Sequence, residues 1–246
     1  MRSNRKCTLL TVFTAITLSV GSLLAGAAPQ PAAKTPVEIT ANAIEYDAPS
    51  GIMHATGGVR ITQGQTVMTG AEAKYNVKSQ EGQLTGGVQA VNQDATLSAA
   101  QVQTYKNNTH LIARGDAVLT KGDKRLTGPQ VEYFPDTQYV LVPESGRIEM
   151  PDGTMTADKI EAFINENSAT GTGSVHIVSP VRKLDATANM ATYYGEPKGQ
   201  SKVILTGNAR AVQDGNVLVG ETLTLRLDEK AMDASGGRNQ LVITPQ

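Results

Sequence analysis

Three histidines are the side chains of this chain best suited to hold a metal. A transition-metal site needs several imidazole, thiolate or carboxylate groups that converge on one point. His54, His110 and His176 lie far apart in the sequence and occupy different positions of the repeat described below. We therefore predict no metal site and no bound cofactor.

Acidic side chains could supply general acid and base catalysis, as they do in enzymes that cleave polysaccharides. Glu45, Glu132 and Glu161 alternate with apolar residues, which places them on the solvent side of predicted strands. We expect no paired-carboxylate site, because the acids do not recur in neighbouring repeats with aromatic residues beside them. The sequence also contains no HExxH, GxSxG, CxxC or phosphate-binding loop pattern. We predict no catalytic residues and a protein that is not an enzyme.

The first 27 residues have the layout of a secretory signal peptide. Three basic residues precede an apolar run, and the small residues Ala25-Gly26-Ala27 follow it. We expect cleavage after Ala27, a linker at 28–36 and one folded domain at 37–246. The alternative is an uncleaved membrane anchor, because the run is near the shortest length that spans a bilayer.

Composition limits the partners of the mature chain. The whole sequence has 22 basic and 23 acidic residues, and removal of the three basic residues of the signal peptide leaves 19 against 23, a net charge of −4. Nucleic acid is not an expected partner, because no basic stripe is available for phosphate groups. The single cysteine, Cys7, precedes the apolar run, so the mature domain must be held together without disulfides.

A repeat of about 29 residues runs through the domain. Its first residue recurs at intervals of 29, 29, 29, 29, 31 and 32. The seven positions are Thr40, Thr69, Ser98, Thr127, Thr156, Thr187 and Val219. An apolar or small residue follows four positions later, and a glycine or small polar residue follows after 18 to 20. The glycine or small polar residues of the seven repeats are Gly58, Gly87, Asp116, Gly146, Ser174, Gly207 and Gly237.

Each repeat alternates apolar and polar residues with a period of two, which is typical of strands with one buried face. Val131 and Tyr133, for example, share one face, and Gln130 and Glu132 share the other. Turn residues recur at half the period. The domain should therefore be all-β, with about seven two-strand repeats, about fourteen strands in total and no helix.

Two architectures fit this pattern. A two-stranded unit cannot bury its own apolar face, but stacked units can. One solution is a twisted β-jelly-roll of antiparallel strands around an apolar groove, and the other is a parallel β-helix with one unit per coil. Several inward positions are small, as at Ala73, Thr104 and Ala162. The pattern leaves open whether the interior is a filled core or an open slot.

Three segments resemble the OstA-like domain of the lipopolysaccharide-transport bridge proteins, the LptA family. They are Gly58-Val-Arg-Ile-Thr-Gln-Gly64, Met68-Thr-Gly-Ala-Glu72 and Thr40-Ala-Asn-Ala-Ile-Glu-Tyr46. The resemblance is good over residues 37–95 and fades towards the end of the chain. It implies a β-jelly-roll that is open along one side and lies in the periplasm, or is anchored in the inner membrane if the N-terminal segment is not cleaved.

The resemblance also implies a carrier that shelters the acyl chains of lipopolysaccharide and passes them from the inner-membrane transporter towards the outer membrane. The implied partners are the lipid A part of lipopolysaccharide, inner-membrane LptC-like and outer-membrane LptD-like jelly-roll proteins, and further copies of the chain joined end to end. Terminal strands would join these partners by β-augmentation, through Val37, Ile39, Leu241 and Ile243. The residues expected to line the groove are Ile44, Tyr46, Val59, Ile61, Ala73, Tyr75, Val88, Val102, Val118, Val131, Tyr133, Ile148, Ile160 and Val175.

Without the resemblance, the repeat fits two other kinds of protein. A structural or adhesive secreted β-solenoid would have a closed core and parallel strands. A β-helix polysaccharide lyase or hydrolase would need a cluster of acids or bases on one outer face.

Overall fold

The computed structural model describes residues 37–105, 109–195 and 201–244. The expected signal peptide and linker lie outside these residues. Every regular element of the described residues is a strand, as the sequence predicts. Among these same residues there is no helix with the length and apolar character needed to cross a membrane.

Eighteen strands follow one another in the described residues. They are β1 (Val37–Thr40), β2 (Ala43–Asp47), β3 (Ile52–Gln63), β4 (Thr66–Asn76), β5 (Glu81–Asn92), β6 (Ala95–Tyr105), β7 (His110–Lys121), β8 (Lys124–Phe134), β9 (Tyr139–Val142), β10 (Gly146–Met150), β11 (Gly153–Ala157), β12 (Lys159–Phe163), β13 (Ser168–Ser179), β14 (Leu184–Tyr194), β15 (Lys202–Gln213), β16 (Asn216–Arg226), β17 (Ala231–Ser235) and β18 (Gln240–Val242).

All pairings between these strands are antiparallel. Short turns join most consecutive strands, and a turn of a few residues can only connect antiparallel neighbours. The fold is a twisted β-jelly-roll, as predicted. The alternative of a parallel β-helix is wrong, and so is the parallel pairing expected for a β-solenoid.

The eighteen strands form fourteen long rungs, because four rungs are interrupted in the middle. β1 and β2 pair with the two halves of β3 and together make one rung. In the same way, β9 and β10 together make one rung, as do β11 and β12, and β17 and β18. The prediction of about fourteen strands in seven repeats is therefore confirmed for the rungs.

Rungs bend halfway along their length, and in every second rung the backbone φ angles at the bend are positive. In β3, Gly57 and Gly58 have φ of 80° and 64°, and the register with β4 slips between Thr56 and Val59. This is a β-bulge, which sets two residues opposite one and turns the strand. Asp116 occupies the equivalent bend of β7, with a φ of 50°. The glycine or small polar position of the sequence repeat is therefore the bend of the rung.

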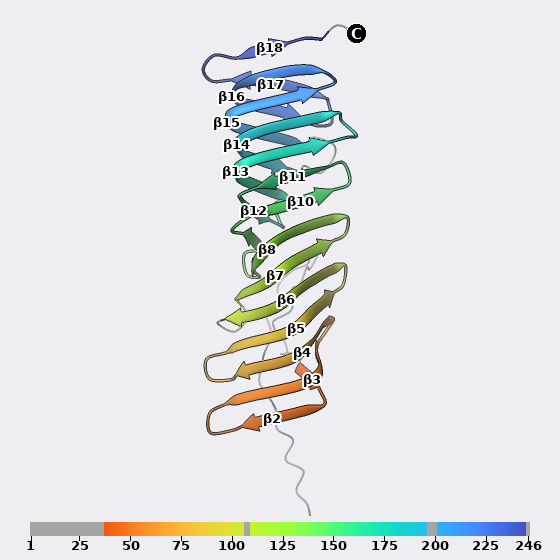
Figure 1. Ribbon diagram of the computed structural model, residues 1–246, viewed down its shortest axis with the longest axis vertical. Coiled ribbons are helices and arrows are strands. Elements are labelled where there is room, and N and C mark those ends of the chain that lie inside the picture. Colours follow the sequence, from red (N-terminus) through yellow and green to blue (C-terminus); the bar gives the residue numbers. More distant parts are fainter. Residues whose placement is uncertain (1–36, 106–108, 196–200, 245–246) are drawn as a thin grey trace, which may run out of the picture.

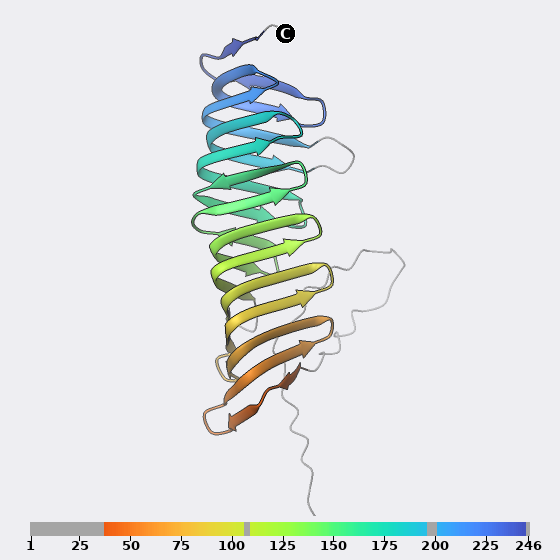
Figure 2. The same cartoon turned by 45° about the vertical axis from the view of Figure 1, so that its right-hand side comes forward.

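The rungs stack in chain order into a column, from β2 at one end to β18 at the other (Figure 1). The turned view shows a front and a back layer of strands along this column (Figure 2). We call the two rows of turns that join the rung ends the first lip and the second lip. The first lip contains the turns at 63–66, 92–95, 121–124, 150–153, 179–184 and 213–216. The second lip contains the described turns at 47–52, 76–81, 134–139, 163–168 and 226–231.

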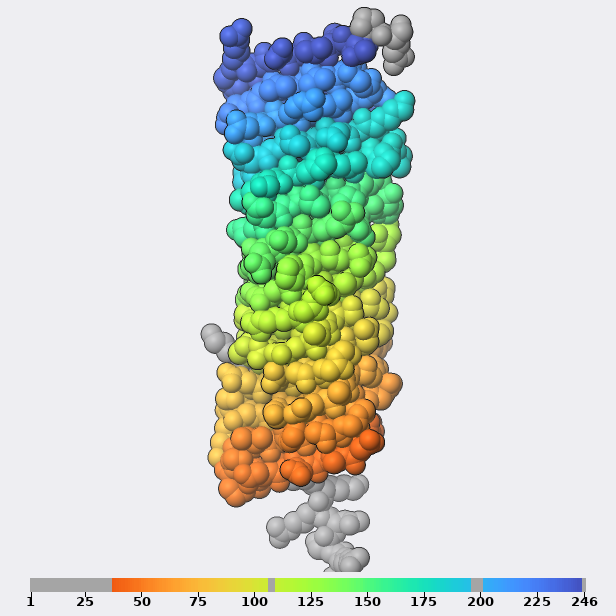
Figure 3. All heavy atoms as spheres, viewed as in Figure 1, coloured from red at the N-terminus to blue at the C-terminus, as the bar shows by residue number. Residues whose placement is uncertain are grey.

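Apolar side chains fill the inside of the bend along the column. Val59, Val102, Ile160 and Leu205 are among the largest fully buried side chains, and they belong to one continuous cluster. Each such side chain stabilises the fold by about 1.5–3 kcal/mol relative to its exposed state. The part of the interior next to the bends is thus a filled core. Seen from outside, the rungs form one column with the N-terminal rungs at one end and the C-terminal rungs at the other (Figure 3).

Candidate functional site

The candidate site is the apolar space between the two lips. Within the described residues, three cavities that lie there are each bordered by residues of both lips. The first and middle cavities share Leu119 and Ile164, and the middle and last cavities share Ile148 and Met150. The three cavities therefore form one groove along the open side of the jelly-roll.

The first cavity has a volume of about 130 Å³ and an almost wholly apolar wall. Met68, Leu97, Val131 and Tyr133 contribute to this wall, with Pro135 at the second lip. Burial raises the pKa of Tyr133 to about 12, so its hydroxyl is neutral at physiological pH. The cavity offers hydrocarbon contacts and no charge in its wall apart from Lys121 at the first lip.

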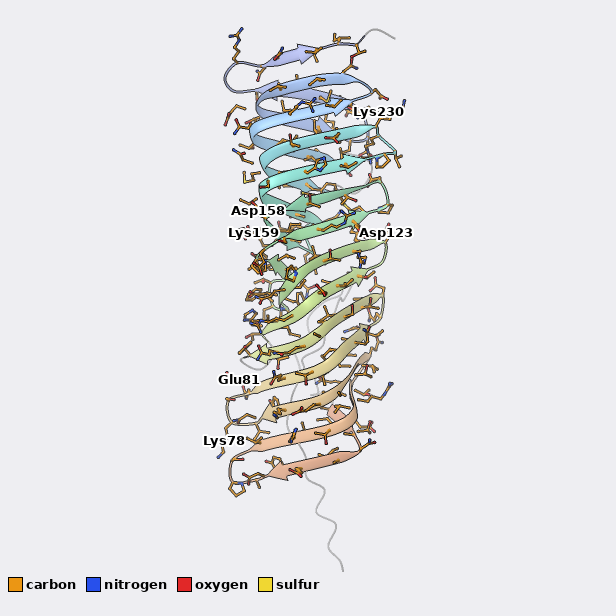
Figure 4. All side chains as sticks on the ribbon, viewed as in Figure 1. Lys78, Glu81, Asp123, Asp158, Lys159 and Lys230 are labelled. Carbon is orange, nitrogen blue, oxygen red and sulfur yellow. The ribbon has the colours of Figure 1, made fainter. Side chains whose placement is uncertain are left out.

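The middle cavity is larger, with a volume of about 540 Å³. Its floor includes Leu126 and Val140, and its mouth is bordered by charged and amide residues of both lips. The labelled Asp123 marks the first-lip turn at this mouth (Figure 4). Across the mouth, Lys124 Nζ donates a hydrogen bond to Asn167 Oδ1 at 2.6 Å. The combination of a hydrocarbon floor and a polar rim suits an amphiphile.

The last cavity is small, about 40 Å³, and a charged side chain crosses it. Arg182 lies in the first-lip turn between β13 and β14, and its guanidinium forms an ion pair with Asp152 of the neighbouring turn. Arg182 Nε also donates to the Leu227 carbonyl oxygen at 3.0 Å, and Nη2 lies 3.5 Å from Asp228 Oδ1. Leu227 and Asp228 belong to the second lip, so this side chain joins the two lips.

The groove is also closed near the N-terminal end of the column. Val37 and Ile39, on β1, pack against Met53 and Tyr75, which lie on the parts of β3 and β4 nearer the second lip. The apolar contact brings the two sides of the groove together at this level. The largest of these cavities therefore lies between a closure at β1 and one at Arg182, and the exposed hydrogen bond from Lys124 to Asn167 crosses its mouth.

Ten of the fourteen residues predicted to line the groove are buried. They are Val59, Ile61, Ala73, Tyr75, Val88, Val102, Val131, Ile148, Ile160 and Val175. Of these, Val131 and Ile148 border the cavities, as does the half-buried Tyr133. These ten residues therefore lie on the inward face, and most of them belong to the core beside the bend.

Three predicted lining residues do not face the groove as expected. Ile44 and Tyr46 are 49% and 43% exposed, because β2 lies at the end of the column and pairs only with β3 among the described strands. Val118 is half-buried and pairs with Ser98 and Thr127 on the outer side of the wall. The inward residues of β7 keep a period of two on both sides of the bend, at Leu111 and Ala113 and then at Ala117 and Leu119, so Val118 lies between two inward positions.

Several cavity residues were missed in the sequence. Leu97, Leu119, Leu126, Val140 and Met150 all border a cavity. Leu97, Leu119 and Met150 are half-buried, whereas Leu126 and Val140 are buried core residues that also border the cavity. A count of alternate positions starting from the bend, rather than from the first residue of each repeat, would have found Leu119.

The predicted terminal-edge residues lie at the two ends of the column. Leu241 and Ile243 are 57% and 67% exposed, whereas Val37 and Ile39 are half-buried. Among the described strands, β18 pairs with β16 alone. The outer edge of β18 is therefore unpaired in the described part of the chain, which leaves backbone groups free to join another strand.

The outer surface beside the second lip carries a ladder of aromatic rings. Neighbouring centroids are 4.4–5.7 Å apart along Tyr105, His110, Phe134, Tyr139 and Phe163. Acids lie next to this ladder: Glu132 contacts His110 at 2.8 Å, and Tyr139 Oη donates to Glu161 Oε1 at 2.7 Å. The expectation that acids do not recur beside aromatic residues is therefore wrong. Cross-strand register brings these residues together, and a single sequence does not give that register.

The three histidines do not meet. Each contacts a carboxylate on an adjacent strand: His54 with Glu72 and His110 with Glu132 at 2.8 Å, and His176 with Asp185 at 3.3 Å. In the described part of the chain, no group of three or more His, Cys, Asp or Glu side chains is arranged to hold a metal ion. These pairs are cross-strand contacts on the outer surface.

A family model connects this architecture to known proteins. It is described as LptA/(LptD N-terminal domain) LPS transport protein, and it matches residues 38–168 and 99–231. The chain belongs to this family. The two overlapping matches together extend over most of the described column, in agreement with the resemblance seen in the sequence. The LptA/LptD N-terminal domain family is one of transport proteins, described without reference to an enzyme activity.

One solved structure similar to the chain is the crystal structure of LptH, the LptA homologous periplasmic component of the conserved lipopolysaccharide transport device from Pseudomonas aeruginosa. The sequences are 17% identical, the match covers 86% of this chain and 96% of that chain, and the TM-score is 0.19. No curated protein sequence matches the chain. Membership of the family therefore rests on the family model.

Proposed function

We propose that the chain is a periplasmic carrier that shelters the acyl chains of lipopolysaccharide in the groove between its lips. It would receive them from the inner-membrane transporter and pass them towards the outer membrane. The observation that carries the proposal is the open apolar groove itself, with a 540 Å³ cavity at its centre. Membership of the LPS transport family supports the choice of cargo.

The energetics of acyl chains explain why such a groove is needed. Transfer of one methylene from water to an apolar surface contributes about 0.8 kcal/mol, so a chain of a dozen carbons exposed to water is disfavoured by roughly 10 kcal/mol. A wall of Leu, Val, Ile and Met offsets most of this penalty. Because dispersion contacts have little directionality, such a wall also holds the cargo without a specific geometry that would slow its release.

The two ends of the column suit assembly with other jelly-rolls. The unpaired edge of β18 can add a strand from a partner, and β1 and β2 offer the opposite end. In this proposal the N-terminal end meets an LptC-like protein of the inner membrane, and the C-terminal end meets an LptD-like protein or another copy of the chain. Stacked end to end, the grooves would form one continuous path.

Photo-crosslinking tests the location of the cargo. A benzoylphenylalanine at position 119 points into the first and middle cavities, whereas the same group at position 118 points out of the wall. After irradiation with lipopolysaccharide, we expect at least fivefold more adduct at 119 than at 118. Equal labelling at the two positions would mean that the cargo does not occupy the groove.

A further inference from the structure

Arg182 is placed where it can control the width of the groove. Its side chain is only 16% exposed and spans from the first-lip turn at 179–184 to the second-lip turn at 226–231. Beneath it, Met155, Ile177 and Val203 form an apolar wall. The last cavity at this level has a volume of about 40 Å³, against about 540 Å³ for the middle cavity beside it.

The contacts of Arg182 with the two lips differ in strength. On the first lip, the guanidinium is paired with the Asp152 carboxylate, and the Arg182 backbone N–H donates to Ser179 Oγ at 3.3 Å. On the second lip, it reaches a neutral carbonyl, that of Leu227, and a carboxylate oxygen of Asp228 at the long distance of 3.5 Å. A guanidinium bonds an ionised carboxylate within hydrogen-bond reach more strongly than a neutral carbonyl or a carboxylate at 3.5 Å. The guanidinium is therefore fixed to the first lip and more easily released from the second.

Release from the second lip leaves no charge without a partner. Arg182 keeps its ion pair with Asp152. Asp228 keeps a hydrogen bond from the Ser201 backbone N–H to Oδ2, at 2.8 Å. A buried charge that loses its only partner is strongly destabilising, but both groups here have a second one. The lips can therefore separate at this level by the loss of two polar contacts and of the apolar packing of Leu227.

We propose that Arg182 is a latch that controls passage of acyl chains along the groove. While it joins the second lip, the cargo is confined to the first and middle cavities. When it releases Leu227 and Asp228, the middle cavity becomes continuous with the last cavity through the shared walls of Ile148 and Met150. The latch rests on the proposed function, because it needs an acyl cargo to control.

The methionines of the chain allow a test with almost no change in side-chain shape. Met68 borders the first cavity, Met155 borders the last cavity, and Met190 is 39% exposed on the outside. The full mature chain, made with photo-methionine, is irradiated with purified lipopolysaccharide, and adducts are assigned by peptide mass spectrometry. In the native chain we expect labelling at Met68, little at Met155 and background at Met190.

The variant Arg182→Gln should raise the ratio of Met155 to Met68 labelling at least threefold. Arg182→Lys should raise this ratio as well, because an ammonium can keep the ion pair with Asp152 but lacks the planar fork that reaches Leu227. This variant replaces Arg182→Gln in the test if the glutamine variant does not fold. The matched control is Lys183→Gln, because Lys183 pairs with Asp214 of the same lip at 3.3 Å. It should leave the ratio unchanged.

An unchanged ratio in a folded Arg182 variant that still labels Met68 would overturn the latch and leave the carrier proposal intact. A ratio raised equally by Lys183→Gln would also overturn it, because the effect would then reflect surface charge. Absence of labelling at both Met68 and Met155 in the native chain would instead reject the carrier proposal, and the latch with it.

Discussion

Val118 and Leu119 are neighbours in β7 that face opposite sides of the wall. Leu119 borders the first and middle cavities, whereas Val118 pairs with Ser98 and Thr127 on the outer side. Both side chains are half-buried. The pair therefore separates an effect on the groove from a general effect of changing the strand.

Leu119→Asp should weaken lipopolysaccharide binding at least tenfold, because an ionised carboxylate in the wall must be desolvated when an acyl chain enters. Val118→Asp, one residue away, should change the affinity less than twofold. Binding is measured by displacement of a fluorescent acyl probe. Equal loss of affinity in the two variants would place the binding surface outside the groove.

Gly86→Ala should destabilise the fold through the bend of β5. Gly86 has a φ of 85°, and a Cβ there would collide with the Cβ of Ala71. We expect the free energy of unfolding to fall by about 2–4 kcal/mol, from backbone strain and overpacking together. Gly122→Ala is the control, because Gly122 has a φ of 57° and no atom within 4 Å of the added Cβ. Denaturant titration should show a smaller decrease in the free energy of unfolding for Gly122→Ala than for Gly86→Ala. Equal decreases in the two variants would contradict the role given to the bend.

The pKa of Glu161 should report the contacts on the outer surface. A hydrogen bond from Lys159, and then one from Tyr139 Oη, holds the pKa of this carboxyl below its ordinary value of 4.5. Because the folded pKa is the lower one, the stabilisation is present above pH 4.5 and is lost as pH falls through the folded pKa. We expect Lys159→Met to raise the Glu161 pKa more than Tyr139→Phe does, as measured by NMR titration of the carboxyl carbon. A pKa that neither variant moves would contradict this assignment.

The exposed end of the column should govern association. Leu241→Lys combined with Ile243→Lys adds charge beside the free edge of β18, which disfavours the addition of another strand. Sedimentation velocity over a range of concentrations should show weaker end-to-end association, with unchanged circular dichroism. Val181→Lys is the control, because Val181 is an apolar residue that is 72% exposed in a first-lip turn. The same weakening in the control would exclude a specific role for the end.

The repeat in the sequence was sufficient to predict the rungs, because alternation with a period of two and turns at half the period are both local. The recurring glycine or small polar residue marks the bends in the sequence, but the sequence did not show that the rungs bend at these positions. In β7 the inward residues keep a period of two across the bend, from Ala113 to Ala117 and Leu119, so the choice of Val118 was one position away from the inward face.

The contacts that shape the groove could not be predicted in the same way. Arg182 and Leu227 are 45 residues apart, and they meet only because turns from different repeats lie on opposite lips. Nothing in the local sequence of Arg182 distinguishes it from Lys183, which pairs within its own lip. The aromatic ladder from Tyr105 to Phe163 depends on register across five strands. Such features require the assembled column.

Mass spectrometry of the lipids that co-purify with the mature protein tests the central claim most directly. The protein is isolated from the periplasm without detergent, and its lipids are extracted and compared with those of Leu119→Asp prepared in parallel. We expect lipid A species bound to the native chain and at least tenfold less in the variant. A native chain that carries no lipopolysaccharide, or a folded variant that carries as much as the native chain, would contradict the claim that the groove is a carrier site.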